Sequence, residues 1–258
     1  MKITITFKAK DSDSLTLPTA YNEILQGFIY HNLDGALATF LHDQGFSYEK
    51  RHFRMFAFSR IFGRYHREPA RKAIRFEGPA HFYITTAYEM LSQDLANQML
   101  LGEGFNLNGI SIDVQSVNIE KTVVPEGRCI VKTLSPITVY STIVRPDGRK
   151  FQYFFKPGDS DYDEMITANL IKKYTSFYGK PIEGQVHARP IGPMKARKIY
   201  YKNIGAEAYD GRIEMSGSGE LIKMGLEAGL GSKNAQGYGC VMIDENWKGD
   251  DRLAGKHG

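Results

Sequence analysis

The sequence Gly229-Leu230-Gly231-Ser232-Lys233-Asn234-Ala235-Gln236-Gly237-Tyr238-Gly239 contains two Gly-apolar-Gly triplets separated by five mostly polar residues. Glycine adopts positive φ easily, and it has no Cβ that would keep a ligand away from the backbone. Successive N–H groups in such a segment can form an anion site, to which Lys233 adds a mobile cation. We call residues 229–239 the glycine loop and expect it to bind an anionic group. The alternative is a connection that only turns the chain.

Two common phosphate-binding motifs do not fit this loop. A P-loop requires Gly-Lys-Ser/Thr at the start of a helix, and a dinucleotide fingerprint requires a glycine at the position of Asn234. The loop is followed by the apolar run Cys240-Val241-Met242-Ile243, which is typical of a strand. The sequence therefore predicts the order helix, glycine loop, strand.

Hydrophobic periodicity predicts similar elements in both halves of the chain. In the first half we expect strands at 2–9, 53–59, 81–87 and 110–119, and helices from Pro18, from an Asp34 cap to Gly45, and over 88–101. In the second half we expect strands at 128–142, 150–155, 185–201 and 211–216, helices at 161–178 and 218–227, and a last strand. This order predicts an α+β fold of two tandem ferredoxin-like (RRM-like, βαββαβ) domains. Their predicted ranges are 1–124 and 125–246, followed by a polar tail at 247–258.

Composition limits the classes of protein. The chain has 258 residues, which is long enough to form a sizeable hydrophobic core. Aromatic residues make up 12% and charged residues 24% of the sequence, a composition that is not typical of a disordered chain. Residues 1–8 alternate like a strand instead of forming a secretory signal, and no apolar run approaches the ~20 residues of a membrane span. We expect a cytoplasmic protein that has no membrane partner.

No metal or cofactor is predicted. Cys129 and Cys240 lie in predicted strands without a C-x-x-C motif, as expected for buried, reduced thiols. Three aspartates near the helix at 161–178 have calcium-loop spacing, but Glu164 and Leu170 occupy the positions of the required glycine and glutamate.

Positive charge is concentrated in one stretch. From Lys50 to Arg75 there are nine Lys and Arg against one acid, Glu68, a net charge of +8, and aromatic residues are interleaved with them. A cationic track with rings is typical of proteins that bind single-stranded RNA, although most of these rings also fit a buried strand pattern. The predicted RNA contacts here are Arg51, Arg54, Arg60 and Arg64. A second basic stretch without acids contains Arg189, Lys195, Arg197, Lys198 and Lys202. It is either a further groove for RNA or a solvated face of a strand.

Three histidines, His31, His42 and His52, fall close together and could transfer protons near neutral pH. Of these, His42 is the best placed, because it ends an amphipathic helix whose C-terminus favours the imidazolium, and Gly45 follows it. The alternative role of His42 is a helix C-cap.

The chain resembles the RAMP superfamily, in particular the CRISPR-associated endoribonucleases that cut repeat RNA into guide RNAs. The resemblance rests on the glycine loop, the first strand and helix, Phe40-Leu41-His42 with Gly45, the strand from Phe53 to Phe58, and Ser135-Pro136-Ile137. It implies tandem ferredoxin-like domains, binding of repeat RNA (pre-crRNA), and metal-free cleavage that leaves a 2′,3′-cyclic phosphate and a 5′-hydroxyl.

The resemblance also implies site residues. His42 matches the catalytic histidine, Tyr30 a tyrosine that orients the nucleophile or leaving group, and Lys50 a lysine that stabilises the transition state. Alternatively, Tyr30 is a core tyrosine, and Lys50 is a surface lysine whose role belongs to Arg51. The loop residues expected to contact RNA are Gly229, Gly231, Lys233, Gly237 and Gly239.

Three function classes stay open at this point. The first is the repeat-processing endoribonuclease, and the second is a non-catalytic RNA-binding RAMP subunit of a CRISPR surveillance complex. The third is a ferredoxin-like protein that binds a small phosphate-bearing ligand through the glycine loop. The resemblance leaves open two further kinds of partner, namely other CRISPR-associated proteins and a second copy of this chain.

Overall fold

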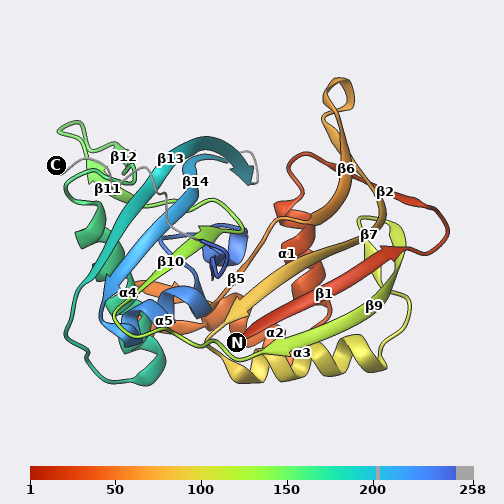
Figure 1. Ribbon diagram of the computed structural model, residues 1–258, viewed down its shortest axis with the longest axis horizontal. Helices are drawn as coiled ribbons and strands as arrows, with labels where there is room; N and C mark the ends of the chain where they lie inside the picture. The colour runs from red at the N-terminus through yellow and green to blue at the C-terminus, as the bar shows by residue number, and fades with distance from the viewer. Residues whose placement is uncertain (202–203, 248–258) are drawn as a thin grey trace.

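The computed structural model describes residues 1–201 and 204–247. Within this range the chain forms two α+β units, the N-terminal one on the right and the C-terminal one on the left of Figure 1. Lys202 of the second basic stretch and almost all of the predicted tail lie outside the described residues. No helix in the described part of the chain is long and apolar enough to span a membrane.

The N-terminal unit is built on a sheet with strand order β2-β7-β1-β9-β8, in which β5 and β6 also pair with β7. Its elements are β1 (Lys2–Ala9), β2 (Ser14–Pro18), α1 (Asn22–His31), α2 (Gly35–Thr39), the π-helix η1 (Phe40–Gln44), β3 (Phe46–Tyr48), β4 (Arg51–Phe53), β5 (Phe56–Phe58), β6 (Phe62–Glu68), the 3₁₀ helix η2 (Pro69–Arg71), β7 (Ala73–Thr86), α3 (Glu89–Leu101), β8 (Asn106–Leu107) and β9 (Ile110–Glu120). Taken as β1, α1, β5–β6, β7, α3 and β9, these elements form the predicted βαββαβ unit.

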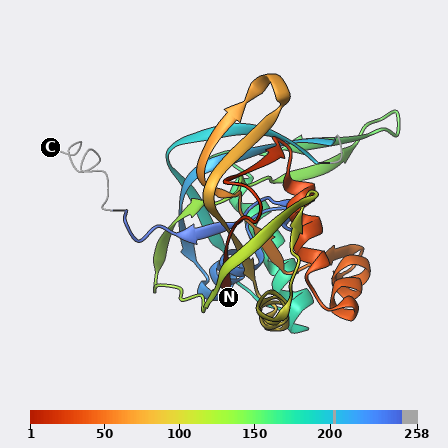
Figure 2. The same ribbon diagram turned by 90° about the vertical axis from the view of Figure 1, so that its right-hand side faces the viewer.

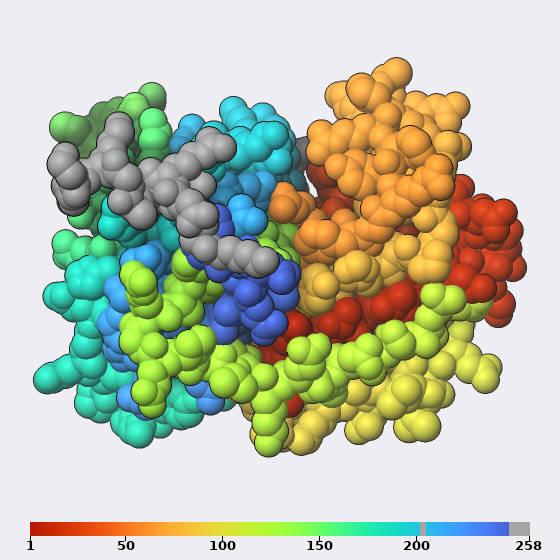
Figure 3. All heavy atoms as spheres, viewed as in Figure 1, coloured from red at the N-terminus to blue at the C-terminus, as the bar shows by residue number. Residues whose placement is uncertain are grey.

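Strict alternation in β1 builds the core of this unit. Ile3, Ile5 and Phe7 are buried with Leu25 and Phe28 of α1, and each such side chain stabilises the fold by about 1.5–3 kcal/mol. Polar residues between them face the other side of the sheet. Figure 3 shows β9, β1 and β7 side by side at the surface on that side. One face of the sheet therefore carries the helices and the other stays open.

The C-terminal unit has a sheet of order β13-β14-β10-β15 and a core of its own. Its elements are β10 (Arg128–Thr133), β11 (Tyr140–Val144), β12 (Lys150–Phe154), α4 (Tyr162–Tyr178), β13 (Val186–Tyr201), β14 (Ile204–Gly217), α5 (Gly219–Ala228), the 3₁₀ helix η3 (Asn234–Gln236) and β15 (Val241–Ile243). Without the β11–β12 hairpin, the order is again βαββαβ. The α+β fold of two ferredoxin-like units is confirmed, whereas the boundary at residue 124 stays a prediction.

Several local predictions were wrong. Pro18 ends β2 and does not begin a helix, because Leu15 and Leu17 are buried where β2 pairs with β7, and α1 starts only at Asn22. The residues between the strands predicted at 53–59 and 81–87 form the long β6–β7 hairpin instead of turns. The strand predicted at 128–142 is interrupted after Thr133, and Cys240 lies just before β15, although both cysteines are free and buried as expected.

Candidate active site in the interdomain cleft

A cleft of about 1060 Å³ lies between the two units. The N-terminal unit contributes residues of α1, His42, and the segment 51–56 to its wall. The C-terminal unit contributes the first residues of β11, two residues of α4, and the glycine loop. The cleft thus brings together the histidine, the first basic stretch and the glycine loop that the sequence singled out separately.

Helix geometry places His42 at the edge of this cleft. The Asp34 carboxylate accepts hydrogen bonds from the N–H groups of Ala36 and Leu37 and so begins α2 as predicted. The helix then widens into the π-turn η1, where Gly45 N–H donates to the Phe40 carbonyl at 2.7 Å. Gly45 has φ 60°, and a Cβ there would lie 2.5 Å from the carbonyl oxygen of Phe53. Glycine is therefore required at this position.

Tyr30 and His42 are neighbours in the folded chain. Their ring centroids lie 5.9 Å apart in an edge-on arrangement, and both side chains line the cleft. The His42 side chain is 75% exposed, and its Nδ1 lies 2.7 Å from a carboxylate oxygen of Asp43. His42 is thus open to a ligand and is not packed among apolar neighbours.

Arg54 lies next to both Tyr30 and His42. Its guanidinium donates to the backbone carbonyl of His42 and lies close enough to the hydroxyl of Tyr30 to lower the pKa of that group. Burial raises the pKa of Tyr30 to about 12, and the charge of Arg54 offsets only part of this effect. Tyr30 is therefore a neutral hydroxyl near pH 7, held next to a cation.

Of the other candidate residues between positions 50 and 52, two line the cleft and one does not. Arg51 and His52 line the cleft, and His52 Nδ1 lies 2.9 Å from the Gln44 carbonyl oxygen, which ties β4 to the end of η1. Lys50 lies in the exposed turn between β3 and β4 and is not among the residues that line the cleft. The structure therefore brings Tyr30 and His42 together with Arg51 and Arg54, while Lys50 lies outside this group.

The four glycines of the glycine loop contact mainly the chain itself. All four have positive φ, between 68° and 84°, and all four are buried. A Cβ at Gly231 would lie 2.4 Å from the Thr138 carbonyl oxygen, and one at Gly237 would lie 2.8 Å from the Phe58 ring of the N-terminal unit. The loop residues that line the cleft include Gly231 and Lys233, whose Nζ lies 5.4 Å from the centroid of the Tyr140 ring. The loop is thus a packed junction with Lys233 on its cleft side.

A buried lysine holds the inside of this loop. Lys173 of α4 donates to the carbonyl oxygens of Gly229 at 2.6 Å and Gly231 at 3.1 Å, and to Oδ1 of Asn234 at 2.8 Å. Burial lowers the pKa of Lys173 to about 7. Because α4 and the loop share these bonds, the position of the loop depends on α4.

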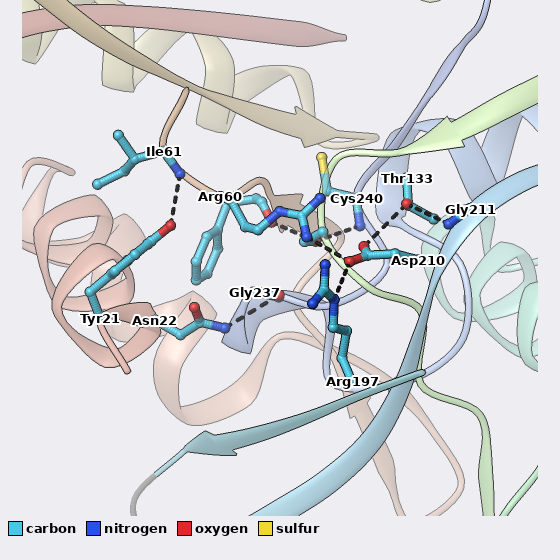
Figure 4. Close-up of polar contacts among 12 residues, drawn as sticks. Tyr21, Asn22, Arg60, Ile61, Thr133, Arg197, Asp210, Gly211, Gly237 and Cys240 are labelled. Carbon is cyan, nitrogen blue, oxygen red and sulfur yellow. Dashed lines mark hydrogen bonds and ion pairs between the residues drawn. The ribbon is translucent and has the colours of Figure 1, made fainter. Parts of the chain in front are cut away.

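Two predicted RNA contacts instead meet at a buried carboxylate. Arg60 of the N-terminal unit and Arg197 of β13 both donate to Oδ2 of Asp210, at 2.7 and 2.9 Å (Figure 4). The Asp210 residue is only 8% exposed, and Thr133 donates to its other oxygen at 3.3 Å. This ion pair network joins the two units, and Asn22, which donates to the Gly237 carbonyl in the same view, adds a second link.

The remaining predicted contacts are exposed. Lys195 and Lys198 lie on β13, with Lys198 Nζ 5.8 Å from the centroid of the Tyr200 ring. Arg64 lies on the β6–β7 hairpin, 3.3 Å from a carboxylate oxygen of Glu77.

Sequence reasoning did not single out Lys173, Asn234 or Asp210 as site residues. One signal could have found Lys173, because it falls among buried positions of α4, between Leu170 and Phe177, where a charged residue is unusual. The partners of Asn234 and Asp210 come from other elements, so nothing in their local sequence marks them.

The fold and the cleft define a protein of two ferredoxin-like units, with a glycine loop packed between them and lining the cleft. The family described as "CRISPR associated protein Cas6, C-terminal" matches residues 118–243. The matched residues include the glycine loop and almost all of the C-terminal unit.

Two relatives match almost the whole chain. The CRISPR-associated endoribonuclease Cas6 1 of Methanocaldococcus jannaschii is 27% identical over 91% of this chain and 91% of its own length. The CRISPR-associated endoribonuclease Cas6 of Pyrococcus furiosus is 26% identical over 95% of this chain and 91% of its own. Among solved structures, a Cas6-related protein from Pyrococcus furiosus has a TM-score of 0.81 at 20% identity, covering 95% of this chain and 98% of that one. This structural likeness shows the shared fold.

Proposed function

We propose that this protein is a metal-independent endoribonuclease that cuts CRISPR repeat RNA (pre-crRNA) into guide RNAs. The observation that carries the proposal is the pairing of Tyr30 with an exposed His42 at the edge of a cleft that also contains Arg51 and Arg54. The match of residues 118–243 to the Cas6 family model, and the similarity to two relatives that are named endoribonucleases, support the same activity.

The reaction needs no group beyond the chain and the RNA. The 2′-hydroxyl oxygen attacks the adjacent phosphorus while its proton passes to a base. The bond from phosphorus to the 5′-oxygen breaks, and an acid protonates that oxygen. The products are a 2′,3′-cyclic phosphate and a 5′-hydroxyl. Charge that develops on the phosphate oxygens must be stabilised by nearby donors.

His42 is the proposed proton-transfer group. Its Nδ1 faces the Asp43 carboxylate, which fixes the ring and assigns proton exchange with the RNA to Nε2. Tyr30, whose pKa is raised by burial to about 12, keeps its proton even in alkaline solution and orients the nucleophile or the leaving group through its hydroxyl. Charge stabilisation is proposed for Lys50 or Arg51, as the sequence suggested, with Arg54, which is bonded to the His42 backbone and close to the Tyr30 hydroxyl, as a further cation.

The proposed RNA path follows the exposed cations. Arg51, Arg54 and Lys233 lie along the cleft, with Arg64, Lys195 and Lys198 outside it. Phosphate contacts by such residues give affinity without sequence readout. Arg60 and Arg197 retain part of their exposure while they pair with Asp210, so a contact with RNA at these two residues would be additional to a structural role.

Purified protein with end-labelled repeat RNA in EDTA tests the proposal. The wild type is expected to give a discrete product with a 2′,3′-cyclic phosphate end. His42→Ala is expected to lose at least ~100-fold in the single-turnover rate, as removal of a proton-transfer group does, and to retain RNA affinity. His31→Ala, which alters an exposed histidine that does not line the cleft, is the matched control. Binding without cleavage by the wild type would instead indicate a non-catalytic RNA-binding subunit.

A further inference from the structure

The β11–β12 hairpin is an addition to the ferredoxin-like plan that the proposed function does not use. Its two strands form a sheet of their own in the described part of the chain, with Ile143 opposite Phe151 and Ser141 opposite Tyr153. Figure 2 shows the hairpin, in green, projecting from the body on the side where α1 and α2 lie. Figure 1 shows it at the outer end of the C-terminal unit, far from α1, so it is a separate arm.

One face of this arm presents two aromatic rings. Phe151 and Tyr153 are two residues apart in β12, so their side chains lie on the same face, and they are 43% and 45% exposed. The Tyr153 ring packs edge-on against Phe155 at 4.9 Å, and the Arg145 guanidinium lies 4.9 Å from the centroid of the Phe151 ring. Rings at alternate positions of a strand form a surface on which successive unpaired bases can stack.

The charge of the arm favours a polyanion over an apolar peptide or a second copy. Between residues 140 and 156 there are four cations, Arg145, Arg149, Lys150 and Lys156, against one acid, Asp147. Asp147 pairs with Arg149 at 3.7 Å. Two such arms facing each other would bring like charges together, whereas phosphates would be attracted.

The arm continues the wall of the cleft. Tyr140, Ser141 and Thr142, the first residues of β11, line the cleft, and Lys233 of the glycine loop lies over the Tyr140 ring. The same strand then runs outward to Ile143 and Val144, which are exposed. Ser141 is opposite Tyr153, so it lies on the face of the hairpin that carries Phe151 and Tyr153, whereas Tyr140 lies on the other face. An RNA strand that follows the cleft wall past Ser141 would therefore reach the two rings.

We propose that the β11–β12 hairpin binds the single-stranded segment of the RNA that leaves the cleft past Ser141. Its bases stack on Phe151 and Tyr153, and Arg145, Arg149 and Lys150 neutralise its phosphates. This inference rests on the proposed function, because the segment is part of the RNA that the cleft holds.

The test compares Phe151→Ser/Tyr153→Ser with Tyr178→Ser, which removes an equally exposed ring at the far end of α4. Each change is placed in a His42→Ala background, so that binding is measured without cutting. Fluorescence anisotropy is measured with labelled repeat RNA and with versions shortened stepwise from each end. The double variant is expected to bind full-length RNA at least ~10-fold more weakly, since stacking accounts for about 5–150-fold per base. The difference in affinity between the double variant and the protein with both rings should disappear when one particular end of the RNA is removed. Tyr178→Ser should bind full-length RNA as tightly as the protein with Tyr178.

Cleavage separates this inference from the proposed function. In a chain with His42 intact, the double variant is expected to cut at the wild-type rate once RNA is saturating, because the arm is remote from Tyr30 and His42. Unchanged affinity of the double variant for full-length RNA would overturn the inference while leaving the nuclease in place. If the double variant keeps its RNA affinity but no longer self-associates, the inference is also overturned, and the hairpin is instead a contact between two copies of the chain. Failure of the wild type to bind repeat RNA would overturn both proposals.

Discussion

Lys173 of α4 and Asn234 of the glycine loop are joined by a buried hydrogen bond of 2.8 Å between Nζ and Oδ1. The Asn234 amide nitrogen in turn donates to the carbonyl oxygens of Leu230 at 3.0 Å and Tyr238 at 3.2 Å. The loop therefore wraps around two side chains that bind its backbone from inside. Its cleft-facing side is fixed by α4, which makes the loop a rigid part of the cleft wall.

Lys173→Met is expected to destabilise the protein by about 3 kcal/mol. The change keeps the volume of the side chain but leaves three buried oxygens without their donor, at a cost of ~1–3 kcal/mol each that does not add fully. The melting temperature should fall by roughly 6–12 °C. Lys172 lies on the same helix and is only partly buried, so Lys172→Met is the matched control and should change the melting temperature by less than ~2 °C. Equal melting temperatures for the two variants would contradict the role of Lys173.

The glycine loop also shows what the sequence could and could not predict. The spacing of Gly229, Gly231, Gly237 and Gly239 indicated positive φ, and the order helix, loop, strand is confirmed. The close approach that glycine permits is made largely to the chain itself, and no pattern within the loop distinguishes that from an approach to a phosphate. Contact of these glycines with RNA stays a prediction.

Tyr30 should not set the pH dependence of cleavage. Burial raises its pKa from 10 to about 12, so its hydroxyl keeps its proton throughout the range from pH 6 to 10. Tyr30→Phe is expected to lower the single-turnover rate ~10–100-fold without changing the shape of the pH–rate profile. A profile in which a limb between pH 6 and 10 disappears in Tyr30→Phe would show that Tyr30 ionises during the reaction.

Asp210→Asn should loosen the contact between the two units. The change removes the charge that Arg60 and Arg197 share across the interface. We expect a loss of about 2 kcal/mol, between the ~3–5 kcal/mol of a fully buried pair and the ~0–1 kcal/mol of a surface pair, because both arginines are partly exposed. Urea unfolding measures this loss, with Asp147→Asn, which alters an exposed pair with Arg149, as the control. A free energy of unfolding equal to that of the control would show that the network contributes nothing to stability.

The same network explains why charge patterns predict a site only in part. The cations from Lys50 to Arg75 form one group in the sequence, but the structural roles of its members depend on partners from distant segments. Arg54 contacts His42 and Tyr30, and Arg60 meets Asp210, which is 150 residues away in the chain. Local periodicity predicted the two repeats of the fold because alternating burial is a local property. Ion pairs between the repeats are formed only after both have folded.

Lys195→Ala/Lys198→Ala separates phosphate contacts from structural charges. Both side chains are exposed on β13, so the melting temperature should stay within ~2 °C of the wild type. If each lysine neutralises one phosphate of a single strand, the slope of log affinity against log salt should decrease by ~0.7 per lysine, or about 1.4 for the pair. Lys8→Ala/Lys10→Ala, which removes two exposed lysines beside the far end of the N-terminal sheet, should leave the slope unchanged. Identical slopes for the two double variants would remove Lys195 and Lys198 from the RNA path. A smaller slope for the β13 variant alone would place the RNA along β13 as well as in the cleft.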